Sequence, residues 1–232
     1  MDQKMRTNRK MLTGITLLSA FVVWTVMILM IDVQPVGQNG TEVGFATINV
    51  WFHKITGVHM LPYTVSDWLG LVPIVICMCF GMVGFIQLIK RRSLFKVDRD
   101  IIWLGVYYIL VIMGYLFFEM VPVNYRPVLI DGRLEASYPS STTLLVLSVM
   151  PTLKYQADRR IESLGIRKAI SIFTLGFSLF MVACRIISGV HWLTDIVGSF
   201  LLSFGLFMIY TSVADSRDSM IVNCDREISY GV

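Results

Sequence analysis

The chain has 232 residues, of which 55% are hydrophobic and only 16% are charged, and its mean hydropathy is +0.67. A soluble domain of this size carries about 25% charged residues, so the composition excludes an ordinary soluble globular protein and favours a membrane protein. The net charge is +4, which is informative mainly through the distribution of the basic residues along the chain.

Six apolar stretches predict transmembrane helices, because a helix needs roughly 20 mainly apolar residues to cross a bilayer. They lie at about 11–31, 69–89, 101–118, 141–153, 169–187 and 192–214. The first is too long for the apolar region of a secretory signal and lacks a cleavage site of small residues, so we expect a retained anchor helix. The fourth is short, and it reaches membrane length only if it continues through Pro151 towards Tyr155.

The basic residues predict the orientation of these helices. With a cytoplasmic N-terminus, 16 of the 20 lysines and arginines fall in segments on the inner side, and only Lys54, Arg126, Arg133 and Arg185 fall outside. Cytoplasmic loops carry such an excess of positive charge. Since six is an even number, the C-terminus returns to the cytoplasm. We expect one membrane domain over 1–215 and a polar cytoplasmic tail over 216–232.

Two of the expected outer segments have a distinctive composition. Residues 33–66 are moderately apolar and rich in aromatic residues, which suits an interfacial helix that lies on the lipid headgroups. Residues 119–140 carry several charges and lead into the sequence Tyr-Pro-Ser-Ser-Thr-Thr at 138–143.

His191 and Asp195 form the first candidate functional group. Residues four apart share one face of a helix, so these two side chains can interact. A carboxylate bonded to one imidazole nitrogen fixes the tautomer and leaves the other nitrogen free as a nucleophile or a base. The alternative interpretation is a solvated, polar start of a helix.

The other two groups are suited to binding an anion. Ser140, Ser141 and Thr142 follow Pro139 at the start of a predicted helix, where hydroxyls either cap the free backbone N–H groups or, with them, bind an anion. Arg126 offers a planar guanidinium that matches phosphate oxygens. An Arg-Pro pair alone carries almost no weight.

The order of these groups, all on the expected outer side, resembles the type-2 phosphatidic acid phosphatase (PAP2) family. The motifs of that family read Lys-x6-Arg-Pro, Pro-Ser-Gly-His and Ser-Arg-x5-His-x3-Asp. The resemblance covers about 101–214, and the third motif is the most specific; here it reads Cys184-Arg185-Ile-Ile-Ser-Gly-Val-His191-Trp-Leu-Thr-Asp195. It implies an all-α bundle of six transmembrane helices of the PAP2/haloperoxidase-like type.

The resemblance also implies a role for each motif residue. His191 would attack phosphorus and form a phosphohistidine, with Asp195 orienting the ring. Arg126 and Arg185 would clamp the phosphoryl oxygens, and Ser140 with the neighbouring N–H groups would complete the binding site. No metal or other cofactor is implied, because arginines and helix dipoles can neutralise the charge on the phosphate.

Four positions depart from the motifs. Glu119 stands in place of the lysine of the first motif, Ser141 in place of the glycine and Thr142 in place of the histidine of the second, and Cys184 in place of the serine of the third. The missing histidine is the general acid of the family, and general acid catalysis is worth about 10²–10⁴-fold. Glu119, His53 and His59 are candidate substitutes as proton donors.

These observations predict a metal-independent lipid phosphatase or phosphotransferase in the cell membrane, with its site facing outside. Its substrate would be a membrane lipid phosphate or, by preference, a polyprenyl or other lipid diphosphate, because a phosphate can leave without a proton donor. Glu119, Ser141 and Thr142 would lie at the substrate, and nucleic acid is not an expected partner. The alternatives are a catalytically silent relative that binds a lipid phosphate headgroup, and a membrane transporter.

Overall fold

The computed structural model describes the backbone of residues 2–230 and the side chains of residues 4–216. Over that part of the chain it contains eight α-helices and two short 3-10 helices, Gln38–Gly40 and Leu94–Lys96. The α-helices are α1 (Asp2–Met30), α2 (Ala46–Thr56), α3 (Met60–Leu69), α4 (Leu71–Arg91), α5 (Arg99–Met120), α6 (Ser141–Arg160), α7 (Leu164–Ser188) and α8 (Leu193–Tyr230). The fold is therefore all-α, as the composition and motifs predicted.

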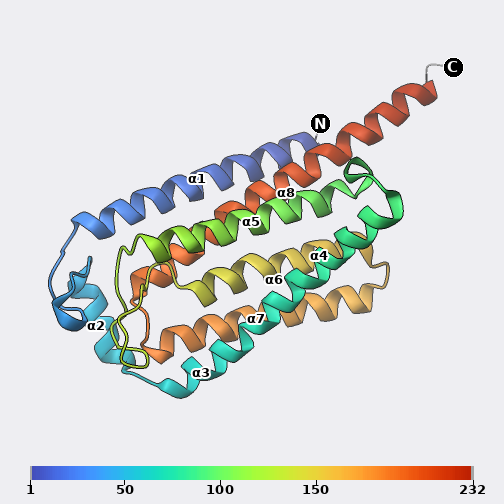
Figure 1. The fold of residues 1–232 in the computed structure, drawn as a ribbon. Helices are drawn as coiled ribbons and strands as arrows, with labels where there is room; N and C mark the ends of the chain where they lie inside the picture. The colour runs from blue at the N-terminus through green and yellow to red at the C-terminus, as the bar shows by residue number, and fades with distance from the viewer. Residues whose placement is uncertain (1, 231–232) are drawn as a thin grey trace.

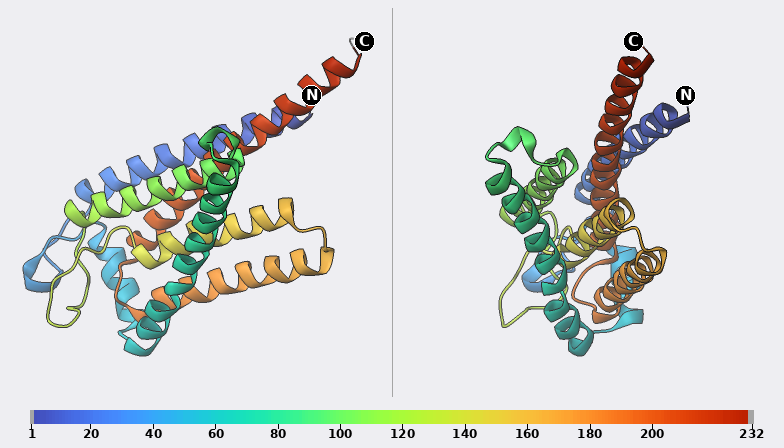
Figure 2. Two further views of the ribbon diagram at one scale, coloured as in Figure 1. Left: turned by 45° about the vertical axis from the view of Figure 1, so that its right-hand side comes forward. Right: turned by 90° about the vertical axis from the view of Figure 1, so that its right-hand side faces the viewer.

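The long helices form one bundle (Figure 1). α1 runs antiparallel along α8, and α6 lies between α7 and α8. α4 crosses the bundle obliquely against α5 and α6 (Figure 2). The beginning of α1 and the end of α8 lie at the same end of the bundle. The loops that carry the candidate site residues lie at the opposite end, which we call the site end.

Among the described residues, five helical segments are long and apolar enough to cross a membrane, and each coincides with a predicted transmembrane helix. They are Lys4–Met30, Met60–Arg91, Arg99–Met120, Leu164–Ser188 and Leu193–Ser216. The predicted helix at 141–153 is not among them. It forms α6, which continues through Pro151 to Arg160 and at 20 residues is about 30 Å long.

The position of α6 explains its weaker apolar signal. Many of its residues are buried, and these include the polar residues Thr143, Ser148, Thr152 and Gln156. A helix surrounded by other helices does not have to present an apolar surface to lipid, because polar side chains can find partners inside the protein. Gln156, for example, donates to the hydroxyl of Tyr210 at 2.7 Å. Of these four residues only Ser148 has a hydroxyl without a partner among the described residues.

Small residues allow α1 and α8 to pack closely. A Cβ atom added at Gly14 would lie 2.6 Å from Ile209 Cγ1 and 2.9 Å from the carbonyl oxygen of Gly205. A Cβ atom added at Gly205 would lie 2.7 Å from Leu18 Cδ2. Because lipid tails are as apolar as the helix surfaces, close van der Waals packing of this kind is a main source of helix association in a bilayer.

Residues 33–66 form two helices where one interfacial helix was expected. α2 ends at Gly57, which has φ +67°, and α3 begins three residues later and leads directly into α4. α2 exposes Ile48, Trp51 and Ile55. Its contact with lipid headgroups stays a prediction.

The end of the bundle opposite the site end is rich in ion pairs. Lys10 lies 2.7 Å and Arg159 3.3 Å from Asp215, and Arg160 lies 2.6 Å from Asp100. α8 continues as a helix to Tyr230, through the segment predicted as a tail. The cytoplasmic location of that segment stays a prediction.

Candidate functional site

His191 lies in the short loop between α7 and α8, and Asp195 lies in the first turn of α8. The Nδ1 atom of His191 is 3.7 Å from Asp195 Oδ2, 3.1 Å from the carbonyl oxygen of Ser137 and 3.3 Å from its hydroxyl. The Ser137 hydroxyl also donates to the Asp195 carboxylate, which accepts from the backbone N–H of Trp192 at 2.8 Å. His191 and Asp195 lie close together as predicted, but across the junction of loop and helix and not on one helix face, and Ser137 shares in orienting the ring.

This arrangement leaves the second imidazole nitrogen free. His191 is 6% exposed, and its Nε2 atom finds no hydrogen-bond partner among the residues that the structure describes. Burial lowers the pKa of His191 to about 4; the positive charges of Arg126 and Arg185 act in the same direction, and Asp195 opposes them. The ring is therefore neutral near pH 7, and Nε2 has a lone pair for attack on an electrophile.

Two arginines face the same region. Among the described residues, each has a polar side-chain partner for only one of its three guanidinium nitrogens. Arg185 Nη2 donates to Asp67 Oδ1 at 3.0 Å and to the hydroxyl of Thr142. Arg126 Nη2 pairs with Glu135 Oε2 at 3.3 Å. The Nε and Nη1 groups of both arginines are buried and find no partner within the described side chains. Since an unpaired buried cationic donor is unfavourable, this arrangement favours binding of an anion.

A polar cavity of about 200 Å³ lies against His191 and Arg126, and Arg185 is not among the residues that line it. It is lined by Tyr115, Glu119, Arg126, Glu135, Ala136, Tyr138, Pro139, Ser141 and His191. Ser140 does not line it, because its buried hydroxyl donates to Thr143 Oγ1 at 3.1 Å. Arg126, Ser141, Glu119 and His191 therefore meet in one cavity, while Thr142 contacts Arg185 beside it.

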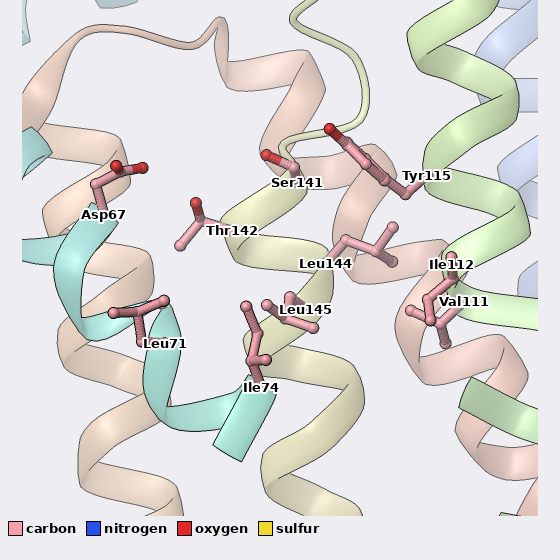
Figure 3. Close-up of a pocket in the computed structure, with 11 residues that line it drawn as sticks. Asp67, Leu71, Ile74, Val111, Ile112, Tyr115, Ser141, Thr142, Leu144 and Leu145 are labelled. Carbon is pink, nitrogen blue, oxygen red and sulfur yellow. The ribbon is translucent and has the colours of Figure 1, made fainter. Parts of the chain in front are cut away.

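An apolar groove of about 260 Å³ adjoins the cavity and shares Tyr115 and Ser141 with it (Figure 3). The groove lies between α4, α5 and α6. Figure 3 shows polar groups at one end, from Asp67, Ser141, Thr142 and Tyr115, and aliphatic side chains at the other. The aliphatic residues are Leu71, Ile74, Val111, Ile112, Leu144 and Leu145. The combined shape suits a molecule with an anionic headgroup and an apolar chain.

The three candidate proton donors lie in different surroundings. Glu119 lines the cavity. The Nε2 atom of His53 is 3.1 Å from the carbonyl oxygen of Gly189, and its ring packs on Trp192 with centroids 5.6 Å apart. His59 is exposed just before α3. Glu119 is thus the one candidate of these three that lines the cavity.

No group of three or more His, Cys, Asp and Glu side chains suited to a metal ion occurs within the described part of the chain. The residues of the site that the sequence analysis missed include Ser137, Tyr63 and Asp67. Ser137 could have been noticed because it directly precedes the Tyr-Pro-Ser sequence. Tyr63 and Asp67 had only their i, i+4 spacing as a signal, far from any motif.

Gly189 holds the loop of His191 close to the end of α2. It has φ +65°, and an added Cβ atom would lie 1.9 Å from the carbonyl oxygen of Gly57. We expect Gly189→Ala to lower the thermal unfolding midpoint in detergent and to displace His191. The positive φ alone disfavours alanine by about 1–2 kcal/mol, and the clash with backbone adds to this.

Gly176→Ala is the matched control for this change, because Gly176 lies in α7 with nothing within 4 Å of an added Cβ. It should leave anion binding unchanged and should not lower the midpoint, because alanine is the better helix former where nothing obstructs its Cβ. Equal midpoints for Gly189→Ala and Gly176→Ala would show that the contact with Gly57 does not constrain the loop.

Comparison with known proteins found one family model and one solved structure that resemble this chain. The model of the PAP2 superfamily matches residues 117–218, a range that includes Arg126, Ser140, Arg185, His191 and Asp195. The fold is similar to the crystal structure of the first transmembrane PAP2 type phosphatidylglycerolphosphate phosphatase from Bacillus subtilis, with a TM-score of 0.58. That likeness covers 90% of this chain and 97% of the other at 16% sequence identity. The search of curated proteins found no match.

Proposed function

We propose that this chain, a multi-pass membrane protein whose residues 117–218 match the model of the PAP2 superfamily, is a phosphatase of membrane lipid phosphates that acts through a phosphohistidine. One observation carries the proposal: the free Nε2 atom of His191 and the unpaired donors of Arg126 and Arg185 are buried around one region. A histidine nucleophile without cationic side chains beside it would suit many reactions. The two arginines select a phosphoryl group.

The reaction proceeds in two steps. Nε2 of His191 attacks phosphorus, the bond from phosphorus to the leaving oxygen breaks, and the lipid departs with that oxygen. Water then attacks the phosphohistidine, inorganic phosphate leaves, and the free imidazole is restored. Arg126 and Arg185 stabilise the charge that the equatorial oxygens carry in both transition states, so the residues of the chain can supply this stabilisation without a metal ion.

The apolar groove supports a lipid substrate. It adjoins the cavity at Tyr115 and Ser141 and holds about 260 Å³ between three helices. A phosphate headgroup in the cavity would place its apolar chain in the groove, where burial contributes about 0.8 kcal/mol per CH₂ group. Thr142 supports a lipid diphosphate as the preferred substrate, because a phosphate leaving group does not require the proton that a histidine at this position would donate.

The test is release of inorganic phosphate by the purified protein in mixed micelles with EDTA present. A panel of phosphatidic acid, phosphatidylglycerolphosphate and a polyprenyl diphosphate covers both linkage types. Release from at least one lipid supports the phosphatase. Binding of these lipids without any release would support the silent headgroup-binding protein instead.

We also propose six membrane crossings, with α6 as the additional one, and a site that faces the outside of the cell. α6 is about as long as a bilayer core is thick, at roughly 30 Å, and runs alongside α7 and α8. The excess of lysine and arginine lies in loops at the end opposite the site end, which is the cytoplasmic end by the positive-inside tendency.

Cysteine labelling tests this orientation in intact cells. In a variant without the four native cysteines, we expect Arg133→Cys to react with a membrane-impermeant maleimide and Glu162→Cys to react only after permeabilisation. Both positions are exposed, so accessibility within the protein does not separate them. The reverse pattern would place the site in the cytoplasm.

A further inference from the structure

Two residues of α3 lie against the arginines of the site. α3 precedes residues 117–218, the part of the chain that matches the superfamily. Tyr63 and Asp67 are four residues apart, so they share one face of this helix. That face packs against α7, which carries Arg185.

Asp67 helps to fix the orientation of the Arg185 guanidinium group. Arg185 is 1% exposed, and Asp67 Oδ1 accepts from its Nη2 group at 3.0 Å. Thr142 accepts from the same nitrogen. With Nη2 held on two oxygens, the planar guanidinium cannot turn about its axis, and Nε and Nη1 remain available for a ligand. Figure 3 shows Asp67 and Thr142 on neighbouring helices at the polar end of the groove.

Tyr63 contacts both cationic groups. The guanidinium carbon of Arg185 lies 4.9 Å from the centroid of the Tyr63 ring, and that of Arg126 lies 6.0 Å from it. The negative face of an aromatic ring attracts a cation within about 6 Å. Two arginines gathered at one site repel each other, and an aromatic ring beside both offsets part of that repulsion before any anion is bound.

We propose that Tyr63 and Asp67 form an arginine platform, which holds Arg185 and Arg126 in the geometry that binds the phosphoryl group. The proposal rests on the proposed function for the identity of the ligand, but it concerns binding of the anion and not its hydrolysis. The platform has a particular importance in this chain, because Glu119 stands where the family motif has a lysine. The two arginines therefore carry the positive charge of the site.

The test is equilibrium binding of orthovanadate, a phosphate-shaped oxyanion, together with kcat/KM on the best lipid substrate. Asp67→Asn removes the charge and keeps the shape, and we expect it to weaken orthovanadate binding and lower kcat/KM by about 10–100-fold, because a misplacement near 1 Å at a site can cause a loss of that order. Tyr63→Leu should weaken binding in the same direction. Asp67→Glu and Tyr63→Phe keep the carboxylate and the ring, so both should retain most of the binding.

A double-mutant cycle separates positioning from a general effect on stability. In an Arg185→Lys background, the Asp67→Asn change should weaken binding much less than in the wild type, since a lysine has no guanidinium to orient. Thr64→Ala is the control on the same helix, because the exposed Thr64 hydroxyl bonds only to the backbone of Met60 among the described residues. It should leave orthovanadate binding unchanged.

Three outcomes would overturn the platform. One is tighter orthovanadate binding by Asp67→Asn, which would make Asp67 a competitor of the anion. Another is an equal loss of orthovanadate binding from Asp67→Asn in the wild-type and Arg185→Lys backgrounds. The third is orthovanadate binding by Asp67→Asn that equals that of the wild type. If wild-type protein binds orthovanadate but releases no phosphate from any lipid, the proposed phosphatase fails, while the same binding measurements still decide the platform.

Discussion

Replacing His191 by alanine is expected to abolish both lipid hydrolysis and the phosphoenzyme, with a loss of about 10³-fold or more in kcat. His191 is the one of the three histidines of the chain that is among the residues lining the cavity, and its Nε2 atom has no hydrogen-bond partner among the described residues. Phosphohistidine is labile to acid, so labelling with a radioactive lipid phosphate followed by acid treatment measures the intermediate directly. A variant that keeps more than a few per cent of wild-type turnover would rule out this mechanism.

Two further variants show whether the loss of activity in His191→Ala is specific to the nucleophile. His59→Ala removes an exposed histidine outside the cavity and should behave as the wild type. Asp195→Asn should reduce activity less than His191→Ala, because it disturbs orientation of the ring and not bond formation. Ser137, whose carbonyl oxygen lies 3.1 Å from Nδ1, continues to hold the ring in that variant.

The second large effect concerns the leaving group. Wild-type protein is expected to prefer a polyprenyl diphosphate over phosphatidic acid by about 10²–10⁴-fold in kcat/KM, the usual value of general acid catalysis. A phosphomonoester expels an alkoxide, which is strongly basic and needs a proton. A lipid diphosphate expels a phosphate, which leaves without one. Thr142→His should restore the donor and raise kcat/KM mainly for the monoester.

The contact between Thr142 and Arg185 requires a control for this experiment. Thr142→Val keeps the shape of the side chain but removes the hydroxyl that accepts from Arg185. It should therefore lower kcat/KM for both substrates by the same factor and leave the preference between them unchanged. If wild type hydrolyses both lipids equally and Glu119→Gln abolishes this, Glu119 is the acid and the preference argument is wrong. Glu119 lines the cavity and is positioned for such a role.

Length and composition were sufficient to predict five of the long helices, because a membrane span must be apolar along about 20 residues whatever its neighbours are. The five candidate spans coincide with those predictions. The same criterion of apolar length predicted only a short helix at 141–153, where the structure has α6. Because α6 is buried among other helices, it can carry polar residues along its length. The hydropathy of one segment does not reveal that neighbouring helices shield it from lipid.

The sequence by itself also predicted the pair of His191 and Asp195 from their i, i+4 spacing. In the structure only Asp195 lies in α8, and His191 approaches it from the loop that precedes this helix. The resemblance to the PAP2 family implied that Arg126 and Arg185 bind a common phosphate, and in the structure both guanidinium groups lie against the Tyr63 ring, with Arg126 also lining the cavity. The residues that hold these groups were decided only by the fold. Asp67 is 118 positions from Arg185, and Ser137 is 54 positions from His191.

Such long-range partners leave little trace in one sequence, because any helix face with a tyrosine and an aspartate four apart looks like a solvated surface. Only the packing of α3 against α7 turns that face towards Arg185. The opposite case is Ser140, which the motif predicted to lie at the phosphate. In the folded chain its hydroxyl bonds to Thr143, and of the two serines predicted at the substrate only Ser141 lines the cavity, since the direction of the first helical turn depends on how α6 packs.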